Sequence, residues 1–164
     1  MAYLIDTSVF IHAKKLYYGF DFCPAFWDWI VEKNAAQVVF SIERVRDEIA
    51  AGTDDLSTWA AQRGASFFLA PDARVMPALR ALSDWAGAGK YDAAAINTFL
   101  AVADSYLVAQ ASALGVAVVT NEVVKNSRKT IQIPEACAAL NVNCITPFEM
   151  LRRERARFVL PIRP

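Results

Sequence analysis

The sequence has 164 residues, of which 17 are basic and 17 acidic, so its formal net charge is zero, and 55% of it is hydrophobic. This length fits a single domain over residues 1–164. Proteins that coat long nucleic acids non-specifically are usually basic, so the balanced charge argues against that class. It remains compatible with an enzyme that contacts a short stretch of RNA.

Membrane insertion and secretion are both disfavoured by the distribution of apolar residues. No apolar run approaches the ~20 residues needed to cross a bilayer. The first residues, MAYLIDTSVF, lack the basic segment of a signal peptide, and Asp6 interrupts their apolar stretch. We therefore expect a cytoplasmic protein with no membrane association.

Cysteine and histidine offer little for metal chemistry. The three cysteines are far apart in no CxxC motif, and His12 is the only histidine. A zinc site built on Cys/His pairs is therefore not expected, and we predict free thiols.

Short apolar runs alternate with helical patterns along the chain, which predicts a parallel α/β sheet. We expect strands at residues 3–5, 37–40, 66–69, 116–120 and 143–145. The first expected helix begins at residues 6–8, capped by Thr7 or Ser8, and the third begins after Ser41 as its N-cap. We expect the later helices at residues 24–31, 41–52, 56–64, 71–86, 91–114, 134–140 and 148–157. The helical segment 91–114 should break near residues 103–104. Right-handed crossovers would place helices on both faces, giving a three-layer α/β/α fold.

Two acidic residues fall at the carboxyl ends of predicted strands, where sites form in parallel sheets. Asp6 directly follows the first strand, and Glu122 comes two residues after the strand that closes at Thr120. For Asp6 alone, a helix N-cap and a metal ligand are equally good interpretations.

Helical geometry adds two more acids. Ile42, Val45 and Ile49 define a buried stripe; Asp47 points nearly opposite it, whereas Glu48 lies on its flank and can reach inward. Glu48 taken alone would be read as a surface acid.

Asp104 heads an apolar stripe itself, because Leu107, Val108 and Ala111 follow it at spacings of three, four and seven residues. A carboxylate aligned with a buried face is a helix cap, a ligand or both.

Four carboxylates brought together would raise each other's pKa values, and a divalent cation resolves that repulsion. Oxygen ligands with retained waters suit Mg²⁺ or Mn²⁺. Such an ion can activate water for phosphodiester hydrolysis without a histidine or a nucleophilic serine. Thr7, Thr120 and Asn121 lie at the same rim and are candidates for orienting ligands or phosphate.

At these residues the sequence resembles the PIN-domain family. LIDTSVFI resembles its first motif, SIERVRDEI its second, and ADSYLVAQASALGVAVVTNE its third and fourth. The tail IQIPEACAALNVNCITPFEMLR resembles a poorly characterised branch related to VapC-like toxins. The resemblance covers nearly the whole chain, with four motifs in order.

This resemblance implies a three-layer fold with a five-stranded parallel sheet and a Mg²⁺- or Mn²⁺-dependent ribonuclease whose catalytic and metal-binding residues are Asp6, Glu48, Asp104 and Glu122. It also implies a homodimer, an RNA substrate and, in toxins, an antitoxin partner. Glu122 departs from the aspartate that many family members carry there.

Two other functions stay open. A non-catalytic PIN-like module that binds RNA or protein is compatible with the neutral charge and with Glu122. A different Mg²⁺-dependent phosphohydrolase is disfavoured, since no D-x-D motif follows the first strand and no P-loop is present. Two basic segments are candidates for RNA contact, namely Lys125, Arg128 and Lys129 after Glu122, and the arginines of LRRERARF near the C-terminus, which equally suit a helix end.

Overall fold

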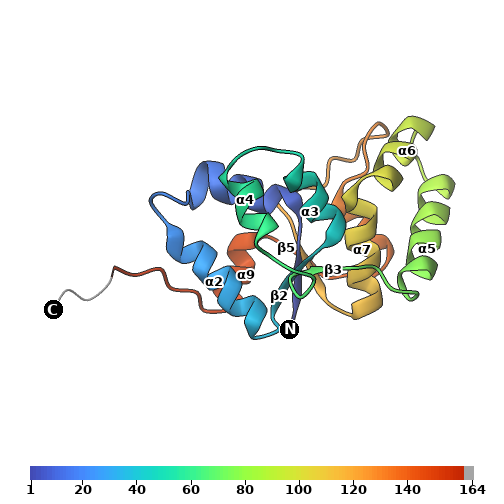
Figure 1. Ribbon diagram of the computed structural model, residues 1–164. Helices are drawn as coiled ribbons and strands as arrows, with labels where there is room; N and C mark the ends of the chain where they lie inside the picture. The colour runs from blue at the N-terminus through green and yellow to red at the C-terminus, as the bar shows by residue number, and fades with distance from the viewer. Residues whose placement is uncertain (161–164) are drawn as a thin grey trace.

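A computed structural model describes residues 1–160 and confirms an α/β fold, in which a five-stranded, all-parallel sheet lies between helices (Figure 1). The spatial order of the strands is β3-β2-β1-β4-β5. Their bounds are β1 (Tyr3–Ile5), β2 (Val39–Ile42), β3 (Phe68–Leu69), β4 (Ala117–Val119) and β5 (Cys144–Ile145).

Strand β1 is the centre of the sheet and the point where the topology changes direction. Its residue Tyr3 pairs with Val39 of β2 on one side and with Ala117 of β4 on the other. The chain adds β2 and β3 on one side of β1, then crosses back and adds β4 and β5 on the other. The crevice at such a switch point, outside the carboxyl ends of the strands, is where open α/β sheets bind ligands.

Helices cover both faces of the sheet, as right-handed crossovers require. On one side Figure 1 shows α2, α4 and α9, and on the other α5, α6 and α7. The bounds of the helices are α1 (Thr7–His12), a π-helix η1 (Ala13–Tyr17), α2 (Pro24–Ala35), α3 (Glu43–Ala50), α4 (Asp55–Ala61), α5 (Val75–Ala88), α6 (Ala93–Ala101), α7 (Ala103–Leu114), α8 (Ile133–Ala139) and α9 (Pro147–Arg153).

The expected N-cap at Ser41 is wrong, because this residue belongs to β2, which starts and ends two residues later than predicted. The Ser41 side chain is fully buried, and its Oγ donates a hydrogen bond to the carbonyl of Ile5 at 2.7 Å. A hydroxyl that is satisfied by the neighbouring strand is no longer needed as a cap. The pattern of a short polar residue before a helix does not distinguish these two uses.

Two other helix boundaries depend on local backbone geometry. Helix α5 starts at Val75 rather than at Pro71, because a turn closes first from Val75 N to the carbonyl of Asp72 at 3.0 Å. The predicted break in the 91–114 segment is present at Val102, whose extended ψ of 178° separates α6 from α7. Because α7 begins as a new helix after this break, the backbone amides of its first turn have no partner within the helix and can donate hydrogen bonds to other groups.

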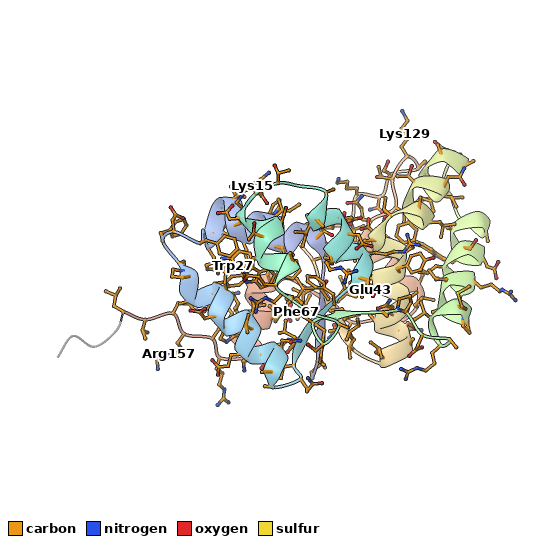
Figure 2. All side chains as sticks on the ribbon, in the orientation of Figure 1. Lys15, Trp27, Glu43, Phe67, Lys129 and Arg157 are labelled. Atoms are coloured by element: carbon orange, nitrogen blue, oxygen red, sulfur yellow. The ribbon has the colours of Figure 1, made fainter. Side chains whose placement is uncertain are left out.

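The aromatic residues pack mainly into the core on the α2 side of the sheet. Trp27 and Phe67 point into the layer between α2, α4 and the sheet (Figure 2). Trp59 joins them, with its ring centroid 5.0 Å from that of Trp27 and 5.5 Å from that of Phe67. Among the aromatic residues between positions 17 and 29, Phe26 and Trp27 are buried in this core, Tyr18, Phe20 and Trp29 are half-buried against it, and Tyr17 and Phe22 are exposed. None of the helices described here is long and apolar enough to cross a membrane.

Candidate active site

The four candidate acids reach one region of the molecule from four different elements. Asp6 directly follows β1 and Glu122 comes three residues after β4, so both stand at the switch point of the sheet. Glu48 lies in the last turn of α3, and Asp104 lies in the first turn of α7. The charges of Asp6, Glu122 and Glu48 all act on the Asp104 carboxyl. The four acids are therefore near enough for the charges of three of them to act on the fourth, Asp104.

Asp6 is only 3% exposed and occupies the N-cap position of α1. Within residues 1–160 its side chain makes no full capping hydrogen bond, although the backbone amides of Thr7 and Ser8 lie near enough to lower its pKa. Its Oδ2 accepts hydrogen bonds from the hydroxyls of Ser8 and of Thr120, the latter at 2.9 Å. Burial raises the pKa of Asp6, and these two hydroxyls oppose that rise.

Asp104 is partly buried, and the negative charges of the other three acids act on its carboxyl. Its pKa is raised to about 7, first by burial and then by the negative charges of Asp6, Glu122 and Glu48. At neutral pH about half of the Asp104 carboxyls therefore carry a proton. A cation placed among these carboxylates would replace that proton and relieve the repulsion.

The two glutamates are bound to the starts of helices. Glu48 is exposed, but its Oε1 accepts a hydrogen bond from the Ala103 amide at 3.1 Å and its Oε2 accepts one from the Thr7 hydroxyl. Glu122 is partly buried, and its Oε2 accepts a hydrogen bond from the Ile133 amide at 2.7 Å. Burial raises the Glu122 pKa, and this amide opposes the rise. Each glutamate therefore satisfies an amide that the first turn of α7 or α8 leaves free.

Hydroxyl and amide side chains tie the ends of β1 and β4 together. The Thr120 hydroxyl, besides donating to Asp6, accepts a hydrogen bond from the Glu122 amide at 3.0 Å. Asn121 donates from its side chain to the Ser8 carbonyl at 3.2 Å and from its backbone to the Ser8 hydroxyl at 3.3 Å. Ser8, for which sequence reasoning favoured a capping role, instead joins Asp6 to Asn121.

The donor set suits a hard divalent cation, with the ligands divided among several residues. In the part of the chain that the structure describes, no three Asp, Glu, His or Cys side chains are placed to hold one ion together. Pairs of carboxylates completed by water fit the way Mg²⁺ is usually bound, since this ion keeps several waters. Asp6 and Asp104 are the pair that would hold the ion.

The two basic segments lie in different places. A pocket of about 280 Å³ is lined by Asp104, Glu122 and Lys129, and the positive charge of Lys125 lowers the Glu122 pKa. The labelled Lys129 side chain extends away from the body of the molecule (Figure 2). The C-terminal arginines lie elsewhere, because Tyr3, at the start of β1, donates to Glu154 just after α9 at 3.0 Å. That places the end of α9 at the edge of the sheet opposite the acids.

Comparison with known proteins identifies a family without assigning an activity. No curated protein and no solved structure matches the sequence. Residues 3–158 match the model of a family described as a domain of unknown function (DUF4411), and because this match spans nearly the whole chain, the protein belongs to that family.

Proposed function

We propose that the protein is a metal-dependent endoribonuclease of the PIN type that hydrolyses RNA phosphodiester bonds. The observation that carries this proposal is the convergence of four carboxylates at the switch point of a parallel sheet, with Asp104 raised to a pKa of about 7 by burial and the other three. Unrelieved repulsion of this kind in a crevice marks a functional site more often than a structural one.

The residues divide the work of such a reaction. A bound Mg²⁺ or Mn²⁺ would supply an activated water and would stabilise the negative charge that develops on the phosphate. Asp6 and Asp104 would hold the ion, and the hydroxyls of Ser8 and Thr120 hold Asp6 in position. Glu122 Oε2 accepts the hydrogen bond from the Ile133 amide, which leaves Oε1 for a ligand. The Thr7 hydroxyl holds Glu48 in position by donating a hydrogen bond to its Oε2.

The biological setting is proposed on the resemblance to VapC-like proteins. The four motifs occur in the family's order, and the acids that they supply converge in the fold. On that basis the protein acts in the cytoplasm as the toxin of a toxin–antitoxin pair, forms a homodimer, and is held inactive by an antitoxin protein.

A second function, a non-catalytic module that binds RNA or protein, is favoured by the roles of the two glutamates. Glu48 and Glu122 each accept a hydrogen bond from the first turn of a helix, which is a sufficient structural reason for both. In this case the acids hold α7 and α8 against the sheet and no metal binds.

The two functions are separated by an RNA cleavage assay with purified protein, a mixed RNA pool and either Mn²⁺ or EDTA. Asp104→Asn is the test variant. Asp47→Asn is the matched control, because Asp47 is exposed on α3 beside Glu48 and pairs with Arg46 at 3.3 Å. Cleavage that requires both Mn²⁺ and Asp104 supports the nuclease. Absence of cleavage, together with absence of Mn²⁺ binding by calorimetry, supports the binding module.

A further inference from the structure

Two of the three cysteines lie side by side where α8 meets β5. Cys137 is near the end of α8, and Cys144 is the first residue of β5. Between them the chain turns back on itself, and the Val142 amide donates to the Cys137 carbonyl at 2.8 Å. Helix α8 packs against β5, and the two thiols lie within hydrogen-bonding reach of each other. Both thiols are free, so the pair is in its reduced form.

The two thiols differ in how easily a reagent reaches them. Cys137 is fully buried in the hydrophobic core, whereas Cys144 is only partly buried against it. Cys144 also belongs to β5, which is the last strand of the sheet and has a neighbouring strand on one side alone. A small molecule in solution therefore meets Cys144 first.

The contact between the thiols also favours Cys144 as the nucleophile. The neighbouring Cys137 thiol lowers the pKa of Cys144, while burial and the negative charges of Asp6 and Glu122 oppose that fall. The same contact raises the pKa of Cys137, and burial raises it further. Because the thiolate is the reactive form of cysteine, Cys144 attacks first and Cys137 keeps its proton until Cys144 has reacted.

The elements that carry the two cysteines also support the candidate site. In β5 the Ile145 carbonyl accepts a hydrogen bond from the Thr120 amide at 3.1 Å. At the start of α8 the Ile133 amide donates to Glu122 at 2.7 Å. A covalent bond between the cysteines would therefore join the helix that holds Glu122 to the strand that holds Thr120.

We propose that Cys137 and Cys144 are a redox-active pair that forms a reversible disulfide by exchange with a low-molecular-weight disulfide such as oxidised glutathione. The Cys144 thiolate attacks one sulfur of the reagent, displaces a thiolate and becomes a mixed disulfide. Cys137 then gives its proton to the displaced thiolate, and its sulfur attacks Cys144 Sγ and displaces the second thiolate, which is protonated by water. Two electrons pass from the protein to the reagent, which leaves as two thiols. In a reducing compartment such a bond is transient and acts as a redox sensor.

The equilibrium of the protein with reduced and oxidised glutathione tests the proposal. Cys23→Ser is the background, because the partly buried Cys23 at the start of α2 then cannot compete. Samples are quenched with acid, and peptides with and without the Cys137–Cys144 bond are quantified by mass spectrometry. We expect the equilibrium constant for forming this bond to be at least about tenfold larger in the folded protein than in the same chain unfolded in urea, since the fold holds the thiols together.

Two single variants separate the roles of the cysteines. Cys137→Ala should stop the reaction at the mixed disulfide, so that Cys144 retains one glutathione. Cys144→Ser should leave the buried Cys137 unmodified in the folded protein. The reverse pattern, with glutathione on Cys137 alone, would overturn the assignment of Cys144 as the attacking thiol.

Two results with the Cys23→Ser protein overturn the proposal as a whole. The first is an equilibrium constant that is no larger in the folded protein than in urea, because the fold would then add nothing to the reaction of two nearby cysteines. The second is a folded protein that stops at the mixed disulfide on Cys144 although Cys137 is present. Neither result involves RNA or a metal ion, so the test is independent of the proposed nuclease function.

Discussion

The two aspartates and the two glutamates of the site differ in what holds their oxygens. Glu48 and Glu122 accept hydrogen bonds from the first turns of α7 and α8, so the fold accounts for both. Asp6 is held by side-chain hydroxyls, and Asp104 stands among like charges with its pKa raised. Packing alone gives no reason to keep two such carboxylates close together. The two aspartates are therefore the stronger indication of a functional site, whereas the two glutamates also have a structural role.

Substitutions of the two aspartates and of the two glutamates should differ most in their effect on activity. Asp104→Asn should lower the Mn²⁺-dependent rate of RNA cleavage by ~10²-fold or more, as loss of one electrostatic stabiliser does in other enzymes. Glu48→Gln and Glu122→Gln keep an oxygen for the helix amides and should lose less. Initial rates on one RNA substrate give the comparison. Equal losses for all four acids would erase the distinction.

Divalent metal should stabilise the wild-type protein through the aspartates. At a free Mn²⁺ concentration 100 times the dissociation constant, linkage predicts ~2.7 kcal/mol added to the free energy of unfolding. Thermal unfolding with and without Mn²⁺ measures the effect. Asp6→Asn and Asp104→Asn should lose it, while Asp47→Asn should keep it. A Mn²⁺ shift that survives both aspartate substitutions would place the metal elsewhere.

Without metal, Asp104→Asn should make the protein more stable at pH 8. The Asp104 pKa is about 7 in the folded protein, above its ordinary value of 3.8, so the folded state binds more protons than the unfolded state. The contribution of Asp104 to the free energy of unfolding is therefore fully present below about pH 4, and it is lost as the pH rises from about 4 to 7. Asparagine mimics the protonated carboxyl, so at pH 8 the free energy of unfolding of Asp104→Asn should exceed that of the wild type by on the order of 1–3 kcal/mol. Urea unfolding at pH 8 and pH 4.5 tests this, since the advantage should shrink at the lower pH.

The smallest effect concerns the glutamate that caps α8. Glu122→Ala removes the acceptor of the Ile133 amide and should destabilise the protein by ~1 kcal/mol, whereas Glu122→Gln retains an acceptor and relieves repulsion. Amide hydrogen exchange at the start of α8 should accelerate in the alanine variant alone. Acceleration in both variants would mean that the charge of Glu122, not its oxygen, holds the helix.

Much of the fold and of the acid cluster could be predicted from sequence, because both depend on short-range patterns. Apolar runs place the strands, and the parallel sheet then brings the residues after β1 and β4 to one rim. The spacing of Leu107 and Val108 after Asp104 identifies its helical face, and both residues are fully buried in the fold. Element identity follows from these patterns, while the boundary at Ser41 depends on a tertiary partner and the boundary after Pro71 on a local turn.

The hydrogen-bond partners of the acids, and an open cleft of about 990 Å³ that Glu48 lines, could not be predicted in the same way. The bond between Glu48 and Ala103 joins residues 55 positions apart, and no local pattern encodes it. The cleft needs α3, residues 71–76 and α7 together. One signal was available in retrospect, since Ala103, Tyr106 and Gln110 share a face of α7 at spacings of three and seven residues.

The hydrogen bond from Thr120 to Asp6 spans 114 residues, and this separation has a consequence during synthesis. The amino-terminal strand cannot pair with β4, and Asp6 cannot acquire its hydroxyl donor, until most of the chain has left the ribosome. Contacts of such long range form late, after the loops between them have closed. A nascent chain that has not yet released Thr120 therefore lacks the assembled group of carboxylates, and under the proposed function it would not yet cleave RNA.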